Sequence, residues 1–439
     1  MSSIPQRRSA EAASADPHTE PAPRGHGVAR ALGLGLITGA ADDDPSAIGT
    51  YAAAGAKVGP AFLWTAPVTF PMMFAVVYLS AKLGQVTGKG LFAIIRDHYS
   101  PRVLWITLIG VLIGNTFEAA ADLGGMAAAL QLVLPWRFEG LVTAIGIVIF
   151  ALQWWGSYRV IRNVFRVLAL TLLSYIAAAF LAHPDWSRVL RATAVPTVRF
   201  DREFLSLLVA ITGTSLSAYL YTWQSNQEVE EEIAMGRTRL RDRVGATRRE
   251  LGESRRDILF GMVFSNIVMY FIILSTAATL FTAGKTDVQT AADAARALEP
   301  LAGRAAGLLF TVGVIGVGFL AIPVMTTGAA YDLSQSVGWH NTLGAKPREA
   351  GKFYGAIAVV TAVAIGVNFL GFNPMKVLVW AGIVQGFSTP PLMLLILRMT
   401  NDRRVMGQRV NGRAINALGW MTAAAIFSAS AGLVVSWFL

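Results

Sequence analysis

Three consecutive aspartates are followed by a proline at Asp42-Asp43-Asp44-Pro45, and their carboxylates are candidate ligands for a metal cation. They interrupt an apolar run, about 29–58, that is long enough to cross a bilayer. A charged Asp at the centre of a spanning helix costs about 2.5 to 3.5 kcal/mol, so such carboxylates usually face water, a cation or a partner. Because Pro45 disrupts the helix and disfavours helical geometry at Asp44, we expect two half-helices. Their junction would expose carbonyl and carboxylate oxygens, which suit a hard cation.

A second pair of acids, Glu118 and Asp122, lies within another apolar run, and Gln385 lies in the middle of a later one. A spacing of four residues stacks Glu118 and Asp122 on one face of a helix. Such a pair either hydrogen-bonds to neighbouring segments or lines a permeation path. We favour the path, because both acids lie well inside the run. Gln385 is a candidate neutral oxygen ligand.

The stretch 211–227, ITGTSLSAYLYTWQSNQ, is rich in hydroxyl residues. Ser and Thr compete for backbone hydrogen bonds, so the stretch favours a second helix interruption, with Ser/Thr-mediated helix packing as an equal alternative. Acids and then arginines follow between residues 228 and 256. This order is typical of a solvated cytoplasmic helix with ion pairs four residues apart.

All of these residues lie in or next to segments that we expect to be membrane helices. Of the 439 residues, 54% are hydrophobic and only 15% are charged, which is too apolar for a soluble globular protein. We therefore expect an all-α, polytopic membrane protein of about 11 transmembrane helices, each needing about 20 apolar residues. The expected segments are 29–58 (broken), 61–82, 103–134, 139–156, 160–182, 204–227, 257–282, 301–334, 353–371, 375–398 and 414–438. Residues 1–27 have no apolar core and are expected to be a disordered cytoplasmic tail.

The net charge of +10 does not indicate nucleic-acid binding, because Lys and Arg gather in every second loop. Cytoplasmic loops carry the basic excess, so we expect a protein of the cell inner membrane with its N-terminus in the cytoplasm and its C-terminus outside. The loop 182–203 carries four arginines yet falls outside, and it disagrees with this topology. The absence of cysteine excludes disulfides and thiolate metal sites.

Two interrupted segments, five apart, match a LeuT-type inverted repeat with broken helices 1 and 6. We expect the repeats at 28–182 and 203–399, the second with a cytoplasmic loop at 228–256, and an additional helix 11 at 414–438. With these residues in view, the sequence resembles the Nramp family of divalent metal transporters. The family motif Asp-Pro-Gly-Asn corresponds here to Asp44-Pro45-Ser46-Ala47, and the motif Met-Pro-His corresponds to Ser217-Ala218-Tyr219.

The departures from these motifs resemble the Nramp-related magnesium transporter branch. Ser217 replaces the methionine whose thioether prefers soft transition metals, and Ala47 replaces an asparagine that adds an amide oxygen. The remaining oxygen ligands suit Mg²⁺, which often keeps several waters. The resemblance implies as metal ligands the carboxylate of Asp44, the carbonyl groups of Ala41, Ala47 and Thr214, and the side chain of Ser217. The permeation path is expected to pass Asp43, Glu118, Asp122, Tyr219, Gln224 and Gln385.

We therefore expect a secondary transporter, not an enzyme, that takes up Mg²⁺ and also Mn²⁺ by alternating access. Tyr219 and Gln224 stand where proton-coupled members have histidines, so the membrane potential is expected to drive uptake without proton coupling. The alternatives are a proton-coupled Mn²⁺ or Fe²⁺ transporter, an organic-solute transporter of the same architecture, and a cation-binding membrane sensor without transport. The expected partners are the metal ion, as substrate, and the lipid bilayer, with no cofactor and a monomeric chain.

Overall fold

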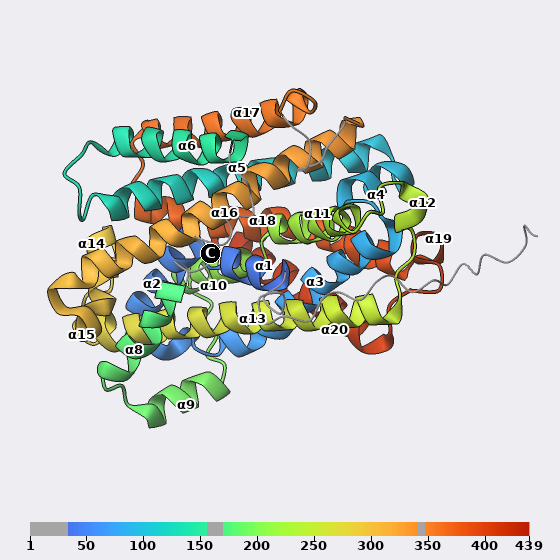
Figure 1. Cartoon of the computed structure of the whole chain (residues 1–439). Helices are drawn as coiled ribbons and strands as arrows, with labels where there is room; N and C mark the ends of the chain where they lie inside the picture. The colour runs from blue at the N-terminus through green and yellow to red at the C-terminus, as the bar shows by residue number, and fades with distance from the viewer. Residues whose placement is uncertain (1–33, 156–169, 340–346, 439) are drawn as a thin grey trace, which may run out of the picture.

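The structure is a computed structural model that describes residues 34–155, 170–339 and 347–438 (Figure 1). Within these ranges every regular element is a helix. The longer helices are α1 (Leu34–Asp42), α2 (Pro45–Val58), α3 (Thr65–Thr87), α4 (Leu91–His98), α5 (Pro101–Leu130), α6 (Phe138–Trp155), α8 (Ser174–Leu181), α9 (Trp186–Ala194), α10 (Arg202–Ser215), α11 (Ala218–Ala234), α13 (Arg248–Thr276), α16 (Ala306–Val337), α17 (Gly351–Val367), α18 (Pro374–Asn401) and α20 (Arg413–Ser436).

Short helical turns connect these helices. The short α-helices are α12 (Leu240–Arg243), α14 (Ala291–Ala295), α15 (Glu299–Ala302) and α19 (Arg403–Met406). The 3₁₀ turns are η1 (Gly59–Phe62), η2 (Leu170–Leu173), η4 (Arg296–Leu298), η5 (Gly303–Ala305) and η6 (Asn368–Leu370), and η3 (Ala277–Phe281) is a π-helical turn that continues α13.

Nine stretches of the described residues are long and apolar enough to cross a bilayer, with α10 and α11 counted as one stretch. The two halves of the first expected segment, α1 and α2, are each too short, because a span needs about 20 residues. Of the fifth expected segment, 160–182, the part 160–169 lies outside the described residues, and η2 and α8 form most of the rest. The expected tail, 1–27, lies outside them entirely. The prediction of an all-α polytopic protein is confirmed, and the expected segment number roughly fits.

The first interruption lies between α1 and α2, where the sequence predicts it. Asp44 is extended (φ −63°, ψ 171°), and its side chain caps α2 by accepting a hydrogen bond from the N–H of Ala47 at 2.7 Å. Pro45 occupies the first position of α2, where its missing N–H costs no helical hydrogen bond and its fixed φ suits the helix. A side-chain cap is worth about 1 kcal/mol. Residues adjacent in sequence therefore fix this break.

The second interruption separates α10 from α11 at Leu216 and Ser217, although neither a proline nor an acid stands there. Ser217 is extended (φ −61°, ψ 140°), and its side chain makes no capping hydrogen bond to α11. Other side chains hold this junction. The hydroxyl of Tyr221 donates to the carbonyl oxygen of Leu216 at 2.5 Å, and the N–H of Ala218 donates to Gln385 Oε1 at 3.4 Å. Of the two alternatives that the sequence left open, the structure has the interruption.

The first half of each interrupted helix packs backbone to backbone on a long helix. α1 lies between α13 and α16 (Figure 1), and a Cβ at Gly39 would clash with the carbonyl oxygen of Gly261 on α13. α10 packs on α18, and a Cβ at Gly213 would clash with the carbonyl oxygen of Gly382. Small residues permit such close approach in membrane helices. Glycine thus places both junctions in the interior of the bundle.

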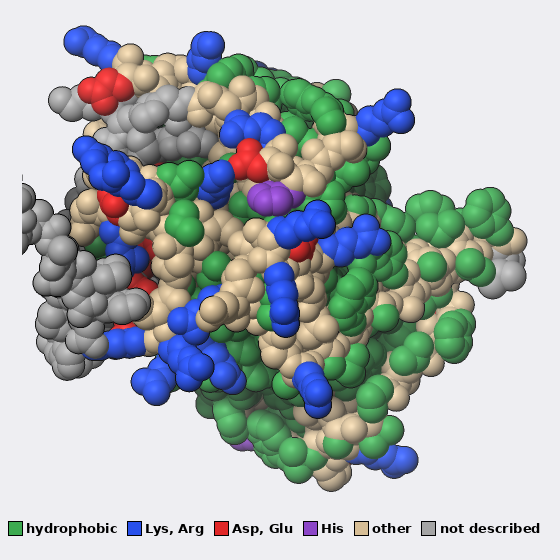
Figure 2. Space-filling model, turned by 90° about the vertical axis from the view of Figure 1, so that its right-hand side faces the viewer, with side chains coloured by type: hydrophobic (Ala, Val, Ile, Leu, Met, Phe, Trp, Pro, Cys, Tyr) green, Lys and Arg blue, Asp and Glu red, His purple; other side chains and the backbone are tan. Residues whose placement is uncertain are grey.

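Lys and Arg side chains gather over one end of the molecule. Figure 2 shows this end face on, and it is the side of Figure 1 on which α4, α12 and α19 lie. We name it the Arg-rich end and define it by α4, the connection 235–247 that contains α12, and α19.

The acidic stretch after residue 227 departs from the sequence expectation. α11 continues to Ala234 and α13 begins at Arg248, so the connection at the Arg-rich end is shorter than the expected loop 228–256. Glu228 and Glu232 are each only 4% exposed, so the prediction of a solvated helix is wrong for these two residues. Gln85 of α3 donates a hydrogen bond to Glu228 at 2.6 Å, and Arg237 pairs with Glu232 at 3.4 Å. Tertiary partners therefore take the place of solvent.

Candidate metal-binding site

Three carboxyl groups meet at Ser46, in the first turn of α2. The N–H of Ser46 donates to Asp122 Oδ1 at 2.9 Å, and its hydroxyl lies 2.8 Å from Asp44 Oδ1 and 3.2 Å from Glu118 Oε1. All four side chains are fully buried. The predicted stacking of Glu118 and Asp122 on one face of α5 is what brings both to the broken helix. We name Asp44, Ser46, Glu118 and Asp122 the Ser46 cluster.

The junction of α1 and α2 presents two further oxygen atoms to one side chain. The hydroxyl of Tyr219, on α11, lies 2.8 Å from the carbonyl oxygen of Ala41 and 3.1 Å from Asp44 Oδ2. Both are predicted ligand oxygens, and both face this hydroxyl. A phenol has one hydrogen and donates to only one acceptor at a time. The predicted ligand Ala47 lies beside them and donates its N–H to Asp44.

The junction of α10 and α11 adds hydroxyl and carbonyl oxygens beside the acids. The hydroxyl of Ser217 lies 3.2 Å from Glu118 Oε1, 3.0 Å from the carbonyl oxygen of Gly213 and 2.9 Å from that of Thr214. The hydroxyl of Thr214 lies 3.4 Å from Ser46 Oγ. The structure thus brings the predicted positions Thr214 and Ser217 next to the Ser46 cluster.

Gln385 joins the acids to the second interruption. Its Nε2 donates to Glu118 Oε2 at 2.5 Å and lies 3.4 Å from Asn115 Oδ1, while its Oε1 accepts from the N–H of Ala218. The side chain is fully buried. In this arrangement the amide nitrogen, not the oxygen, faces Glu118, so Gln385 supports the carboxylate as a donor.

Asp42 and Asp43 contact a different helix. Ser265 Oγ, on α13, donates to Asp42 Oδ2 at 2.5 Å and lies 3.3 Å from Asp43 Oδ1. Asp42 Oδ1, Asp43 Oδ2 and Asp122 Oδ2 are buried without a hydrogen-bond partner among the described residues. Buried oxygens left unpaired cost about 1 to 3 kcal/mol each. A bound cation would satisfy such oxygens.

Gln224 lies away from the Ser46 cluster, further along α11. Its Oε1 accepts a hydrogen bond from Thr38 Oγ1 at 2.6 Å, and its Nε2 donates to Glu228 at 3.0 Å. The side chain is fully buried. Gln224 therefore lines the interior between the two interruptions and the Arg-rich end, rather than the junction itself.

Sequence reasoning missed three polar residues around the junctions: Ser46, Asn115 and Ser265. Ser46 directly follows Asp44-Pro45, and this position is a signal that could have identified it. Ser265 has no local signal, because it lies 223 residues from Asp42 in the sequence. In the part of the chain that the structure describes, no three carboxylate, imidazole or thiolate groups form a metal-ligand set. A cation bound here would therefore need hydroxyl and carbonyl oxygens beside carboxylate, a combination typical of hard cations.

The sequence matches the family described as natural resistance-associated macrophage protein-like, or Nramp, over residues 35–436. The chain belongs to the Nramp family. A protein of Ralstonia nicotianae named divalent metal cation transporter MntH is 30% identical to this Nramp chain over 424 residues, which cover 92% of this chain and 90% of the relative. A Klebsiella pneumoniae protein of the same name is 25% identical over 395 residues, covering 89% and 90%.

Solved structures show the same fold at lower identity. The manganese transporter of Eremococcus coleocola, in complex with an aromatic bis-isothiourea compound, has a TM-score of 0.70 at 19% identity and matches over 95% of this Nramp chain and 89% of that one. Mhp1, a nucleobase-cation-symport-1 family transporter, has a TM-score of 0.57 at 15% identity over 92% and 89%. The predicted LeuT-type fold is thus confirmed, and the protein is a multi-pass membrane protein.

Proposed function

We propose that this Nramp protein transports divalent metal cations, and that it takes up Mg²⁺, with Mn²⁺ as a second substrate, by alternating access around Asp44. Its relatives in Ralstonia nicotianae and Klebsiella pneumoniae are named divalent metal cation transporters, which supports the class of substrate. We assign the chain to the Nramp-related magnesium transporter branch and propose no enzymatic activity.

The observation that carries the proposal is the convergence of Asp44 Oδ2 and the carbonyl oxygen of Ala41 on one hydroxyl, that of Tyr219. A divalent cation that replaces this hydroxyl would find a carboxylate and a carbonyl already directed to a common point. Such pre-arranged oxygens reduce the cost of binding. The hydroxyl of Ser217 lies against Glu118, which contacts Ser46 beside Asp44, and the carbonyl of Thr214 lies against that hydroxyl, so both supply further oxygens nearby.

The nature of the ligands supports Mg²⁺ over soft metals. Ser217 stands where the family motif has methionine, so this junction offers a hydroxyl oxygen in place of a thioether sulfur. Carboxylate, carbonyl and water ligands suit Mg²⁺ and Mn²⁺, whereas thioether ligands select softer metals. We propose Asp44, Ala41, Ala47, Thr214 and Ser217 as the ligand set.

The driving force in this proposal is the membrane potential. Two charges that move inward across 100 mV gain about 4.6 kcal/mol without a co-ion. We further propose that the protein lies in the inner membrane as a monomer with the Arg-rich end in the cytoplasm, since cytoplasmic loops carry the basic excess. In this orientation the N-terminus is cytoplasmic and the C-terminus is outside, and the repeats span 28–182 and 203–399.

The test is ion uptake by proteoliposomes that contain the purified protein, a Mg²⁺-sensitive dye, a pH dye and an imposed negative potential. Mg²⁺ entry that leaves internal pH unchanged and disappears in Asp44→Ala is the expected result. The absence of flux for Mg²⁺ and Mn²⁺ would overturn transport and favour a cation sensor.

A second candidate function is proton-coupled transport of Mn²⁺ or Fe²⁺. It is favoured by Glu118 and Asp122, two buried acids that contact Ser46 and are suited to carrying protons next to Asp44. In the same proteoliposomes, this function predicts internal acidification during Mn²⁺ entry and no entry of Mg²⁺. Glu118→Gln would then abolish the acidification.

A further inference from the structure

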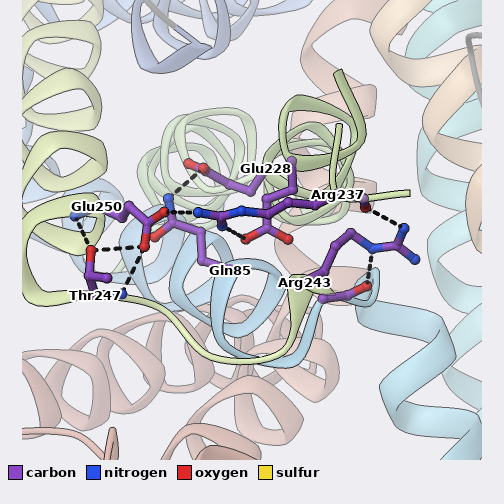
Figure 3. Close-up of polar contacts among 8 residues, drawn as sticks. Gln85, Glu228, Arg237, Arg243, Thr247 and Glu250 are labelled. Carbon is purple, nitrogen blue, oxygen red and sulfur yellow. Dashed lines mark hydrogen bonds and ion pairs between the residues drawn. The ribbon is translucent and has the colours of Figure 1, made fainter. Parts of the chain in front are cut away.

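A second group of buried polar side chains surrounds Glu228 on α11, and Figure 3 shows one of them, Gln85, against this carboxylate. Three side chains donate hydrogen bonds to this carboxylate: Gln85 Nε2 to Oε2 at 2.6 Å, Gln224 Nε2 to Oε1 at 3.0 Å, and Ser254 Oγ to Oε1 at 2.7 Å. All four residues are more than nine-tenths buried. We name them the Glu228 cluster. It joins α3, α11 and α13.

The Glu228 cluster lies between the Ser46 cluster and the Arg-rich end. Tyr219, which contacts Asp44, precedes Glu228 by nine residues on α11, or about 13 Å along a helix that rises 1.5 Å per residue. Gln224 lies between them and also contacts Thr38 of α1. The side chains of α11 from Ala218 to Glu228 are all buried. Nine residues make about two and a half helical turns, so Tyr219 and Glu228 point to opposite sides of α11, and the contacts that lead to Glu228 run from Thr38 of α1 through Gln224. An ion that leaves Asp44 toward the Arg-rich end would therefore pass between α1 and α11.

Glu228 has no basic partner among the described residues. The neighbouring Arg237 is bound by two other carboxylates, Glu250 at 2.6 Å and Glu232 at 3.4 Å (Figure 3). The charge of Arg237 is thus already balanced. A buried carboxylate without a basic partner in a membrane protein is costly and usually marks a functional site.

One oxygen in the cluster is buried and unused. Gln85 is 3% exposed, and its Oε1 has no hydrogen-bond partner among the described residues, although the Nε2 of the same amide contacts Glu228. Rotation of this amide would turn its oxygen toward the carboxylate. A cation would then meet Glu228, the amide oxygen of Gln85 and the hydroxyl oxygen of Ser254. These are the hard oxygen ligands that Mg²⁺ and Mn²⁺ prefer.

We propose that the Glu228 cluster is a second binding site for the divalent cation, on the route between Asp44 and the Arg-rich end. In the structure, three hydrogen-bond donors contact the carboxylate. When the cation arrives, the amides of Gln85 and Gln224 rotate and present oxygen. This proposal rests on the proposed function, because both sites would bind the same transported ion. Counting the ions bound at equilibrium distinguishes a failure of the Glu228 site from a failure of the Asp44 site.

The test counts Mn²⁺ ions bound to the purified full chain by the loss of the electron paramagnetic resonance signal of free Mn²⁺. The wild type is expected to bind two ions, Asp44→Ala one, Glu228→Gln one, and the double variant none. Glu228→Gln keeps the shape of the side chain and removes its charge. The control Glu231→Gln removes one charge from a partly exposed position on the same helix and is expected to bind two ions.

The two proposals fail in different ways. If the wild type binds one ion that disappears in Asp44→Ala and remains in Glu228→Gln, the second site is overturned and Asp44 stands. If one ion is bound that disappears only in Glu228→Gln, the second site stands and the role of Asp44 fails. Two ions retained in Glu228→Gln, or none bound by the wild type at concentrations that saturate uptake, also overturn the second site.

A gain-of-function variant provides an independent measurement. Gln85→Glu places a second carboxylate against Glu228 and is expected to tighten Mn²⁺ binding at this site at least tenfold in the Asp44→Ala background. A purely structural role of the cluster predicts no tightening, because two adjacent carboxylates without a cation only repel each other.

Discussion

The two helix interruptions perform the same geometric task with different means. At the first, Asp44 caps α2 with its own side chain and Pro45 starts the helix. At the second, Ser217 provides no cap, and the carbonyl oxygen of Leu216 and the N–H of Ala218 depend on Tyr221 and Gln385. Both first halves rest on glycine contacts with a long helix. The first break is therefore encoded by adjacent residues, whereas the second depends on residues further along the chain.

The sharpest test of this comparison separates the charge of Asp44 from its capping role. Asparagine caps a helix as well as aspartate does. Asp44→Asn is therefore expected to leave thermal stability nearly unchanged and to lower Mg²⁺ uptake by about 100-fold or more, equivalent to about 2.7 kcal/mol. The control at the second break, Ser217→Ala, removes no charge and is expected to cost less than tenfold in uptake. If Asp44→Asn and Ser217→Ala lowered uptake equally, Asp44 at the first break would not be the carboxylate that balances the charge of the cation.

The glycine contacts are the feature that the two breaks share. Gly39→Ala and Gly213→Ala would each place a methyl group against a carbonyl oxygen, of Gly261 and Gly382 respectively. Each is expected to destabilise the protein by about 1 to 3 kcal/mol through overpacking. Thermal unfolding in detergent measures the effect. The control is Gly110→Ala on α5, where the added Cβ would meet open space, and this substitution should be neutral or stabilising. If only one of the two substitutions lowered stability, the helix packing at the two breaks would also differ.

The dependence of the second break on other side chains is tested at Tyr221. Tyr221→Phe leaves the carbonyl oxygen of Leu216 without its hydroxyl partner and is expected to lower stability by about 1 to 2 kcal/mol. Tyr175→Phe is the matched control. The Tyr175 hydroxyl is buried and has no partner among the described residues, so its removal is expected to be neutral or stabilising. Equal melting temperatures for the two variants would refute the role of Tyr221.

The smallest effect is expected from making the second break resemble the first. Ala218 is the first residue of α11, and the preceding Ser217 already has the extended conformation that proline requires of its neighbour. Ala218→Pro gives up a long hydrogen bond of 3.4 Å to Gln385. It is expected to raise stability by about 0.4 to 1 kcal/mol, because proline restricts the unfolded chain. A loss of stability in thermal unfolding would show that the hydrogen bond to Gln385 outweighs this gain.

The sequence predicts best what neighbouring residues decide. Asp44 and Pro45 determine the break between α1 and α2, because Asp44 caps α2 and Pro45 lacks the N–H that would continue α1. The spacing of four residues between Glu118 and Asp122 places both on one face of α5. The roles of Ser46 and Ser265 as partners of the acids depend on α2 meeting α5 and α1 meeting α13, which no local pattern shows.

Burial of Glu228 is the clearest failure of local reasoning. Acids followed by arginines are typical of a solvated helix. Here the donors to Glu228 include Gln85, 143 residues earlier, and Ser254, 26 residues later. The packing of α3 on α11 and the Ser254 hydroxyl that reaches over from α13 supply the donors that stabilise the buried carboxylate.

The hydrogen bond between Asp42 and Ser265 also has a consequence for biosynthesis. Ser265 is translated 223 residues after Asp42, and at about 5 to 20 residues per second the delay is roughly 11 to 45 s. During that interval Asp42, at the end of α1, and the adjacent Asp43 lack their hydroxyl partner, so we expect α1 to settle in the bilayer only after α13 has emerged from the ribosome. Cysteine labelling of stalled nascent chains that end before and after α13 would show when α1 becomes inaccessible. The first helix of the described residues is then among the last to take its final place.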